Sequence, residues 1–447
     1  MQFIYEMQKI IFPFESLKWN AIKTKIDVEI ESTVQLDSLF VSIHDGKFKA
    51  RTILDMFRKY YDCGDSQLEL YSEEHVLKVL FPLWRRLLLG SKKIFKNPIH
   101  VLSEGTCNQQ FTRTQVATIL TFAWFGLMEI TPKVSRGPVK LKQLPRFCLL
   151  DVFKAGNIHT LHAFLRYFTI VAENLLQEEF TRSIVVVYRR KLPAKPNWRQ
   201  LNKPISEVYL ADAHSENLQS ELDYIFELCP CANMLCKRRF GVDMNYEEIM
   251  FLMHPEAIVA SLICTGMMQD EAILVLGAQK TCKINGYGGS AKYACSVDDM
   301  RYGYGDDGRE LMLQTALICI DASSKLAGIE QHVDTFDRDL TKAYAGFSAL
   351  NFHDIVMASH WSTILFTGNL QVKFIQLLLA ASASDKKLLY LVQSRDFDEK
   401  VNEFMRWIEG DEVTCGQLIE MYQAVISKRV KGNRFSEIDI FGAIMDL

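Results

Sequence analysis

The sequence predicts an α/β domain preceded by an all-α region, and three features of the chain indicate this arrangement. The first third carries apolar side chains at three- and four-residue steps, the period of an amphipathic helix. Short β-branched runs then begin with Ser183–Tyr188, and helical stretches lie between them. The runs Ala272–Leu276 and Ala316–Ile320 are apolar throughout, which is typical of strands covered on both faces. We therefore predict a helical region over residues 1–178 and a layered α/β domain over residues 179–447.

Helical periodicity in the first region is clearest after Thr112, where Thr112 or Thr114 is suited to cap the first turn. The same spacing predicts the other helices of the region. The predicted helices are Val34–Ile43, Ala50–Tyr61, Glu73–Leu89, Arg113–Met128 and Thr160–Leu176. Thr131–Pro145 contains Lys, Pro and Gly, and we expect it to connect the last two helices.

The second region is expected to contain a largely parallel or mixed sheet. The predicted strands are Ser183–Tyr188, Glu207–Leu210, Leu222–Leu228, Glu271–Leu276, Ala316–Ile320, Asp354–Ala358 and Lys387–Val392. The predicted helices are Glu247–Cys264, Phe336–Phe347, Gln371–Ala383, Asp396–Trp407 and Cys415–Ile426. Two glycine-rich segments, Asn285–Gly289 and Tyr302–Gly308, lack the phosphate-loop and dinucleotide-binding patterns, so we interpret them as surface loops.

Composition and charge exclude several classes of function. The chain has 447 residues, of which 49% are hydrophobic and 23% charged, as expected for a soluble globular protein with a substantial core. Its net charge of −3 provides no overall attraction to nucleic acid or membranes, and we expect no sequence-specific nucleic-acid binding. Residues 1–14 lack the features of a signal peptide, and no apolar run reaches the roughly 18 residues that cross a bilayer.

The cysteines indicate a reducing compartment and no metal site. There are 11 of them, an odd number, and they are scattered along the chain, which argues against a disulfide framework. Cys229, Cys231 and Cys236 suggest zinc at first sight. Their spacing is not a common structural zinc pattern, however, and no second pair completes it. We therefore interpret them as buried or half-buried thiols.

The strongest candidate for a site is the charged stretch Cys231–Ile258. It contains the basic triplet Lys237-Arg238-Arg239, then the acidic pair Glu247-Glu248. Two adjacent glutamates at a helix start are commonly explained by the favourable field of the helix N-terminus. A glutamic acid in an apolar cleft, on the other hand, has a raised pKa and can protonate a leaving oxygen, as glycoside cleavage requires. The residues alone leave both interpretations open.

The order of motifs along the chain resembles the poly(ADP-ribose) glycohydrolase family. In that family a glycine triplet precedes Gln-Glu-Glu, which is followed by Ile and a Pro-Glu turn, and Asn245–Ile258 resembles this segment. Other segments resemble the family in the same order over residues 184–425. They are Trp198–Pro204, Gly277–Tyr287, Ala316–Ala322, Lys342–Phe347 and Ile375–Ala381. The specificity of the resemblance comes from this combined order more than from any one motif.

The resemblance implies a macrodomain-like mixed-sheet sandwich that cradles ADP-ribose, packed on a helical accessory domain. Carried over by position, Glu248 matches the catalytic acid and Glu247 the neighbouring glutamate that contacts the ribose. Asn233 matches an asparagine beside the ligand, and Tyr287 matches a tyrosine that helps to hold the adenosine end. The family needs no metal or organic cofactor. The resemblance further implies poly(ADP-ribose) or ADP-ribosylated proteins as partners and a nuclear or cytoplasmic location.

The departures from the family fall on its diphosphate-binding loops. Lys237-Arg238-Arg239 stands about where the glycine triplet is expected, in a loop one residue shorter, and Tyr246 replaces the Gln before the acidic pair. The second glycine-rich loop has become Ser359–Gly368, in which Trp361 remains. The aromatic residue that stacks on adenine falls near Gln393. Because glycines let backbone N–H groups close around a diphosphate, these changes predict weaker substrate positioning.

Three functions remain open on the sequence. The first is a divergent hydrolase of ribose–ribose glycosidic bonds, with Glu248 as the general acid, Glu247 orienting the ribose and water as the nucleophile. The second is a pseudoenzyme that binds ADP-ribose or proteins, because lost substrate orientation can cost roughly 7–11 kcal/mol. The third is a structural or interaction protein in which the pair only begins a helix. His254 and His360 match no functional position of the family, and we interpret both as structural.

Overall fold

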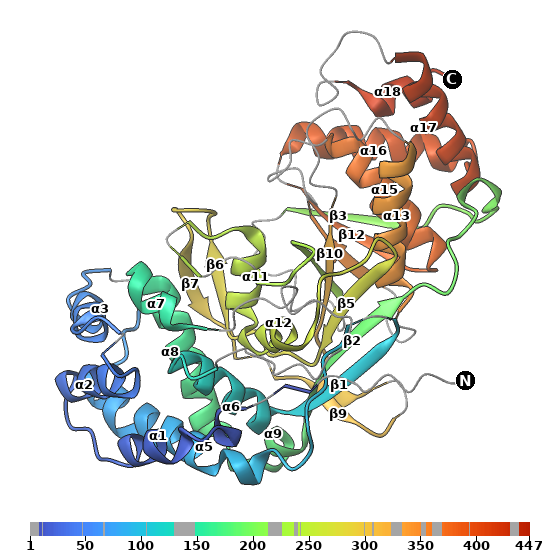
Figure 1. Cartoon of the computed structure of the whole chain (residues 1–447). Coiled ribbons are helices and arrows are strands. Elements are labelled where there is room, and N and C mark those ends of the chain that lie inside the picture. Colours follow the sequence, from blue (N-terminus) through green and yellow to red (C-terminus); the bar gives the residue numbers. More distant parts are fainter. Residues whose placement is uncertain are drawn as a thin grey trace, which may run out of the picture.

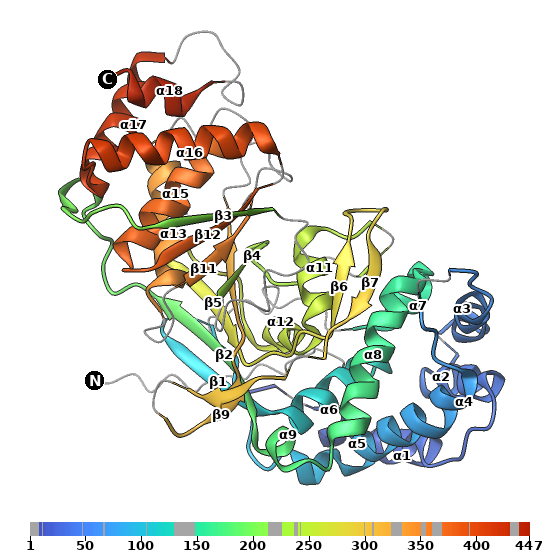
Figure 2. The same ribbon diagram turned by 180° about the vertical axis from the view of Figure 1, so that it is seen from behind.

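The computed structural model of the protein shows a ten-stranded sheet between two groups of helices (Figure 1). The residues that the structure describes are 9–10, 12–46, 48–65, 68–103, 105–128, 148–212, 226–236, 240–241, 243–298, 300–305, 308–322, 333–349, 355–359, 369–392, 394–429 and 438–447. Helices α1 to α9 lie at one end of the molecule and α15 to α18 at the opposite end, and the view from behind shows the same arrangement (Figure 2).

The central sheet is mixed, and its strands follow the order β3-β12-β11-β4-β10-β5-β2-β9-β8, with β1 paired to β2 outside this path. The strands are β1 (Cys107–Thr112), β2 (Ile184–Lys191), β3 (Val208–Asp212), β4 (Phe226–Cys231), β5 (Glu271–Leu276), β8 (Tyr302–Tyr304), β9 (Leu311–Leu313), β10 (Ala316–Asp321), β11 (Ile355–Ala358) and β12 (Lys387–Val392). β3, β12, β11, β4 and β10 are parallel, so their carboxyl ends meet at one edge. β5 runs antiparallel to β10 and β2. β6 (Cys282–Asn285) and β7 (Lys292–Ser296) form a separate hairpin.

The helices of the first third are mostly short. They are α1 (Trp19–Ile26), α2 (Thr33–Ile43), α3 (Thr52–Tyr61), α4 (Glu73–His75), α5 (Phe81–Ile94), α6 (Arg113–Trp124), α7 (Leu150–Ala155), α8 (Ile158–Asn174) and α9 (Glu178–Arg182). Those of the remaining chain are α11 (Tyr246–Met253), α12 (Val259–Ile263), α13 (Val333–Phe347), α15 (Leu370–Ala383), α16 (Arg395–Gly410), α17 (Cys415–Arg429) and α18 (Ile440–Met445). In the described part of the chain, no helix combines the length and the apolar character that a bilayer crossing requires.

The sheet separates two hydrophobic cores, because successive side chains of a strand point to opposite faces. In β10, Leu317 and Cys319 lie in one core, whereas Ile318 and Ile320 lie in the other. The first core is continuous from the helices of the first third through α11 and α12 to the sheet. The second core joins the sheet to α13, α15 and the C-terminal helices. The helices of the first third thus share one core with one face of the sheet.

A buried ion pair connects the first third to the rest of the chain. Arg113, the first residue of α6, pairs with Glu256, and both side chains are fully buried. The Arg113 guanidinium also donates to the Ser183 hydroxyl at 2.8 Å and to the Gly277 carbonyl at 2.6 Å. The Glu256 carboxylate accepts a second hydrogen bond, at 2.8 Å, from the backbone N–H of Gln279. This network fixes α6 against the segment that follows β5, since a buried charge is retained only when it is paired and hydrogen-bonded.

The predicted fold class is confirmed: a mainly helical first third precedes a mixed α/β sheet. One strand, β1, lies within the first 178 residues and joins the main sheet through β2. Its sequence, CNQQFT, lacks the apolar alternation by which a strand is predicted. The boundary between residues 178 and 179 stays a prediction. The connection predicted over Thr131–Pro145 lies outside the described residues.

Two predicted segments differ from the structure. The helix predicted over Glu247–Cys264 is divided into α11, a 3₁₀ turn at Pro255–Ile258, and α12. Pro255 explains the break, because proline has no N–H for the helix ladder and clashes with the preceding turn. The surface loop predicted over Tyr302–Gly308 is wrong in its first part, since Tyr302–Tyr304 forms β8 at the end of the sheet. The other glycine-rich segment, Asn285–Gly289, begins at the last residue of β6 and continues into the turn of the β6–β7 hairpin.

Candidate functional site

The acidic pair lies at the start of α11, which packs on β4 near the edge where the parallel strands end. Asn245 is the N-cap residue of this helix. Its side-chain oxygen accepts the Glu248 N–H at 2.8 Å, and the Glu248 carboxylate accepts the Asn245 N–H at 2.9 Å. This reciprocal arrangement is a capping box, which satisfies two N–H groups that a helix start otherwise leaves without partners. One oxygen of the predicted catalytic acid is therefore engaged in the helix cap.

Glu247 points into the protein and holds the segment that follows β4. Its two carboxylate oxygens accept the backbone N–H groups of Ala232 at 3.1 Å and Cys236 at 2.7 Å. Cys236 has φ 51°, a left-handed conformation that costs a non-glycine residue about 1–2 kcal/mol. The hydrogen bond to Glu247 stabilises this conformation near the predicted position of the family's glycines. Glu247 therefore holds the backbone of this loop in place.

Burial strongly changes the ionisation of Glu247. The residue is 3% exposed, and removal of its carboxyl group from water raises its pKa to about 8. The two N–H donors act in the opposite direction, because they favour the ionised form, and the nearby Glu248 raises the pKa further. Glu248 is also buried, with 2% of its surface exposed. At neutral pH the pair therefore retains a proton while it lies beside the carboxyl end of β4.

Asn233 and Tyr287, the predicted ligand contacts, lie on segments that border the acid helix. Asn233 is exposed in the turn after β4, next to the Ala232 N–H that Glu247 binds, and its carbonyl accepts the Met267 N–H at 2.7 Å. Tyr287 is 36% exposed at the turn of the β6–β7 hairpin. The next residue, Gly288, donates its N–H to the carbonyl of Met244 at 3.0 Å. The structure thus brings the backbone segments of all four predicted residues to one end of α11, while their roles in ligand binding stay predictions.

Part of the chain matches a known protein family. Residues 195–399 match the family model described as poly(ADP-ribose) glycohydrolase, macro domain fold. Over these residues the chain is similar to this family. Over 193 residues, the chain is 29% identical to poly(ADP-ribose) glycohydrolase 1 of Caenorhabditis elegans. The aligned region covers 39% of this chain and 24% of that protein. Over 210 residues, it is 28% identical to poly(ADP-ribose) glycohydrolase 2 of the same organism. This aligned region covers 44% of this chain and 42% of the relative.

A plant relative shows a similar level of likeness. The probable poly(ADP-ribose) glycohydrolase 2 of Arabidopsis thaliana is 29% identical over 111 residues, 24% of this chain and 20% of the relative. The matches cover less than half the length of each of these three relatives. The matched region contains the acidic pair, Asn233 and Tyr287, together with strands β3 to β12. The macrodomain-type fold predicted from the resemblance is confirmed.

Several motifs by which the sequence resembles the glycohydrolase family hold the fold together. Asp321, at the end of β10, pairs with Lys342 and Arg338 of α13. Gly346 allows α13 to approach the sheet, because a Cβ at this position would lie 2.4 Å from the Ile318 side chain. These contacts give a physical reason for the motifs at Ala316–Ala322 and Lys342–Phe347. Their retention therefore supports the fold and carries no information on catalysis.

Tyr246, where the family carries Gln, makes a contact that sequence reasoning missed. Its hydroxyl hydrogen bonds the side chain of Ser359, the residue directly after β11. Burial, together with the nearby Glu227, raises the pKa of Tyr246. The start of the acid helix is thereby connected to the beginning of the second loop. The Tyr in place of the family's Gln was the sequence feature that pointed to a changed contact here, but only the structure identifies Ser359 as the partner.

The cysteines near Glu247 form a cluster of buried thiols. Cys229 and Cys231 of β4 lie beside Cys319 of β10, and both hydrogen bond to it. Burial raises the pKa of Cys231 and of Cys236, and the neighbouring Glu247 raises both further. Cys231 and Cys236 therefore stay neutral at physiological pH and are poor nucleophiles. Within the described ranges, no group of three or more His, Cys, Asp or Glu residues is arranged to hold a metal ion.

His254 is a buried residue at the end of α11. Its Nδ1 lies 3.1 Å from the Met250 carbonyl, and its Nε2 lies 3.8 Å from the Glu227 carboxylate. Lys280 approaches the same carboxylate at 3.6 Å. Burial lowers the pKa of His254 to about 4, so the ring is neutral near pH 7. These contacts agree with the structural interpretation of His254, whereas His360 lies outside the described residues.

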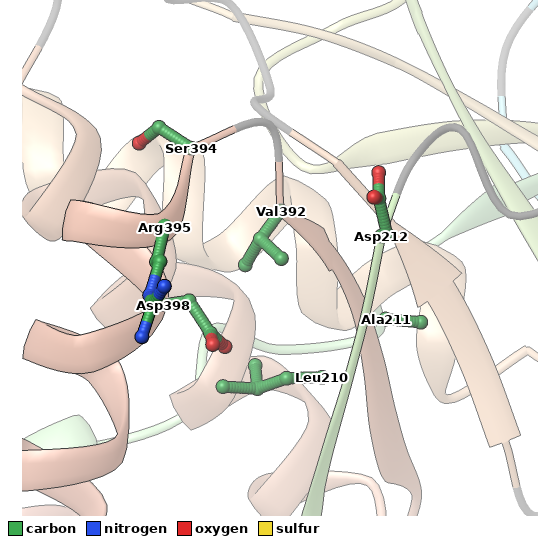
Figure 3. A pocket seen from close by; sticks show the side chains of 7 residues that line it. All are labelled: Leu210, Ala211, Asp212, Val392, Ser394, Arg395 and Asp398. Carbon is green, nitrogen blue, oxygen red and sulfur yellow. The ribbon is translucent and has the colours of Figure 1, made fainter.

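A pocket of about 290 Å³ lies farther along the same sheet edge, between the ends of β3 and β12 and the start of α16 (Figure 3). It is lined by Leu210, Ala211, Asp212, Val392, Ser394, Arg395 and Asp398. Val392 and Ser394 flank position 393, where the family is expected to carry the residue that stacks on adenine. Gln393 itself lies outside the described residues. The basic triplet Lys237-Arg238-Arg239 and Trp361 also lie outside them.

Proposed function

We propose that this chain recognises poly(ADP-ribose) or ADP-ribosylated proteins and hydrolyses ribose–ribose glycosidic bonds with weakened activity. The supporting observation is the buried pair Glu247-Glu248, in which burial raises the pKa of Glu247 to about 8. Adjacent carboxyl groups titrate as a unit, so such a pair holds a proton at neutral pH. General acid catalysis needs a group that is still protonated at the working pH. The similarity of residues 195–399 to the glycohydrolase family supports this substrate class.

In the proposed reaction, Glu248 gives a proton to the leaving ribose oxygen as the glycosidic bond breaks. Water attacks the anomeric carbon, and its proton returns to the carboxylate pair, so the enzyme regains its starting state. The positive character of the sugar in the transition state is stabilised by the negative charge that remains on the pair. Glu247 keeps the loop after β4 in place through its two backbone hydrogen bonds.

The sheet edge supports binding of an extended ligand. The pocket lies at β3 and β12, and the acid helix packs on β4, two strands from β12 in the sheet. Two strand spacings correspond to roughly 10 Å. Ligands of open α/β sheets bind outside the carboxyl ends of the strands. We expect the ADP-ribose unit to run along this edge, in a protein of nuclear or cytoplasmic location.

The alternative is an inactive protein that binds ADP-ribose or other proteins. It is favoured by the burial of both carboxyl groups, 3% and 2% exposed, and by the commitment of one Glu248 oxygen to the helix cap. An acid that cannot reach its substrate loses the benefit of orientation, whatever its pKa. The loss of glycines from both diphosphate loops also favours the inactive protein.

Incubation with purified poly(ADP-ribose) tests the proposal, with Glu248→Gln as the matched variant. The Gln side chain keeps an oxygen that can accept the Asn245 N–H, so the helix cap and the fold should be retained. We expect ADP-ribose release by the parent and a rate lowered at least about 100-fold in the variant. Binding of ADP-ribose without release by either protein would establish the pseudoenzyme. Absence of both binding and release would reject the ligand class.

A further inference from the structure

The β6–β7 hairpin that carries Tyr287 depends on its neighbours for its position. It is a two-stranded sheet separate from the main sheet, and an isolated hairpin of this kind is only marginally stable in water. β7 packs on α8 of the first third, and β6 packs on the acid helix α11. Both ribbon views show the hairpin beside these two helices (Figures 1 and 2). The packing against α8 and α11 therefore determines where the turn of the hairpin lies.

The contact with α8 is made by two buried aromatic rings. His162 of α8 and Tyr293 of β7 meet edge to face, with ring centroids 4.4 Å apart and an interplanar angle of 83°. The two residues are 2% and 5% exposed. Aromatic pairs in this geometry contribute beyond the apolar area they bury. His162 thus provides the surface on which the hairpin packs.

His162 is itself held rigidly within the first third. Its Nδ1 lies 2.7 Å from the Tyr60 hydroxyl, which also accepts the Tyr71 N–H at 3.1 Å. The imidazole stacks on the Tyr71 ring at a centroid distance of 5.4 Å. Burial lowers the pKa of His162 to about 4, and the nearby His159 and Arg166 lower it further. The ring is therefore neutral near pH 7 and fixed by α3 and by the segment after it.

A second contact from α8 reaches the other side of the hairpin turn. The Thr160 hydroxyl donates to the sulfur of Met244 at 3.5 Å. The Met244 carbonyl accepts the Gly288 N–H at 3.0 Å, and Met244 directly precedes the N-cap residue of the acid helix. Helix α8 therefore touches the hairpin through Tyr293 and touches the residue that joins the hairpin turn to α11.

We propose that His162 and Tyr293 are positioning residues of the site. Through this pair, α8 sets the place of Tyr287 relative to Glu247 and Glu248, so a helix far away in the sequence determines how the adenosine end of the ligand is held. The inference rests on the proposed function, in which Tyr287 contacts that end. It assigns to α8 a role in substrate affinity in addition to its role in the core.

A double-mutant cycle between Tyr293 and Tyr287 tests the inference in the full chain. Tyr293→Leu removes the ring contact, and Tyr293→Phe keeps it while removing the hydrogen bond to Ser296. Phe404→Leu is the matched control, because Phe404 is buried and stacks on Phe441 in the second core. The measurements are the affinity for monomeric ADP-ribose and the hydrogen exchange of residues 282–296.

We expect Tyr293→Leu to weaken ADP-ribose binding about tenfold and to speed exchange in the hairpin, with β5 and β10 unchanged. Tyr293→Phe should have nearly the affinity and the exchange rates of the parent, and Phe404→Leu should leave both the ADP-ribose affinity and the exchange of residues 282–296 unchanged. In a Tyr287→Ala background, Tyr293→Leu should cause little further loss of affinity, because the two residues act as one unit.

Independent losses from Tyr287→Ala and Tyr293→Leu would overturn the inference, and so would an equal loss of affinity in the control. If the parent itself does not bind ADP-ribose, the proposed function fails and hydrogen exchange alone decides the positioning. Faster exchange confined to residues 282–296 in Tyr293→Leu would then support it, and unchanged exchange would overturn it.

Discussion

Two buried carboxyl groups lie near the ends of adjacent strands, and the protein holds them in different ways. Asp321 ends β10 and is 6% exposed, and Lys342 and Arg338 neutralise its charge. Glu247 is 3% exposed beside the end of β4, and the partners found for it in the described part of the chain are two backbone N–H groups, with no cation. In the register of the sheet, Asp321 lies opposite Cys231. The next residue, Ala232, donates its N–H to Glu247.

The difference shows how one edge of the sheet combines stability with reactivity. The Asp321 carboxylate, between two cations, holds α13 to the sheet. A carboxyl group that is buried without a cation has a raised pKa, because burial disfavours the charged form. Perturbed groups of this kind gather at functional sites. The acid helix, and not α13, is therefore the part of this edge that is suited to proton transfer.

Removal of Asp321 should have the largest effect on stability. Asp321→Ala leaves the fully buried Lys342 without its carboxylate, and breaking a buried pair in this way costs about 3–5 kcal/mol. The free energy of unfolding in urea measures the loss. The matched control is Glu207→Ala, which breaks an exposed pair with Lys387 and should cost under about 1 kcal/mol. Equal losses in the two variants would contradict the role given to Asp321.

Glu247→Gln should have an intermediate effect, about 1–3 kcal/mol, because an amide cannot accept both backbone N–H groups as the carboxyl does. The variant should also change the dependence of stability on pH. The pKa of Glu247 rises from 4.5 to about 8 on folding, so the folded state keeps a proton that the unfolded chain releases. The contribution of Glu247 is therefore complete below pH 4.5 and declines as the pH rises to about 8.

Urea unfolding at pH 5, 7 and 9 checks this sign. The difference in unfolding free energy between the parent and Glu247→Gln should shrink as the pH rises. The exposed Glu420→Gln variant serves as the control and should follow the parent at each pH. A difference that grows with pH would show that Glu247 is ionised in the folded protein, and the argument for a proton on the pair would fail.

Tyr246→Phe should have the smallest effect. It removes the hydrogen bond to Ser359 and leaves the ring in place, so the expected loss of stability is about 1 kcal/mol. Because the bond connects the acid helix to the residue after β11, hydrogen exchange at residues 355–359 should increase in the variant. Tyr304→Phe, at an exposed position, should leave exchange there unchanged. Unchanged exchange in Tyr246→Phe would remove the proposed connection between the two segments.

Much of the fold was predictable from local pattern. The apolar run Ala272–Leu276 and the β-branched run that begins at Ser183 became β5 and β2, because a strand covered on both faces is rich in apolar side chains. β1 was missed because its polar sequence is ordered by pairing with β2 along its whole length. The three-residue strands β8 and β9 were missed because each is too short to show a strand period; they pair with each other, and β9 also pairs with the distant β2.

The sequence by itself determined the alternation of strands and helices, the resemblance to the glycohydrolase family and the presence of two adjacent glutamates at a helix start. Only the tertiary structure decided what each glutamate does. Glu248 turns back to Asn245, and Glu247 turns inward to Ala232 and Cys236. The reason is physical: the pKa of a carboxyl group depends on its burial and its donors, and those are supplied here by β4 and the loop that follows it. The placement of Tyr287 likewise depends on α8, more than a hundred residues away in the chain.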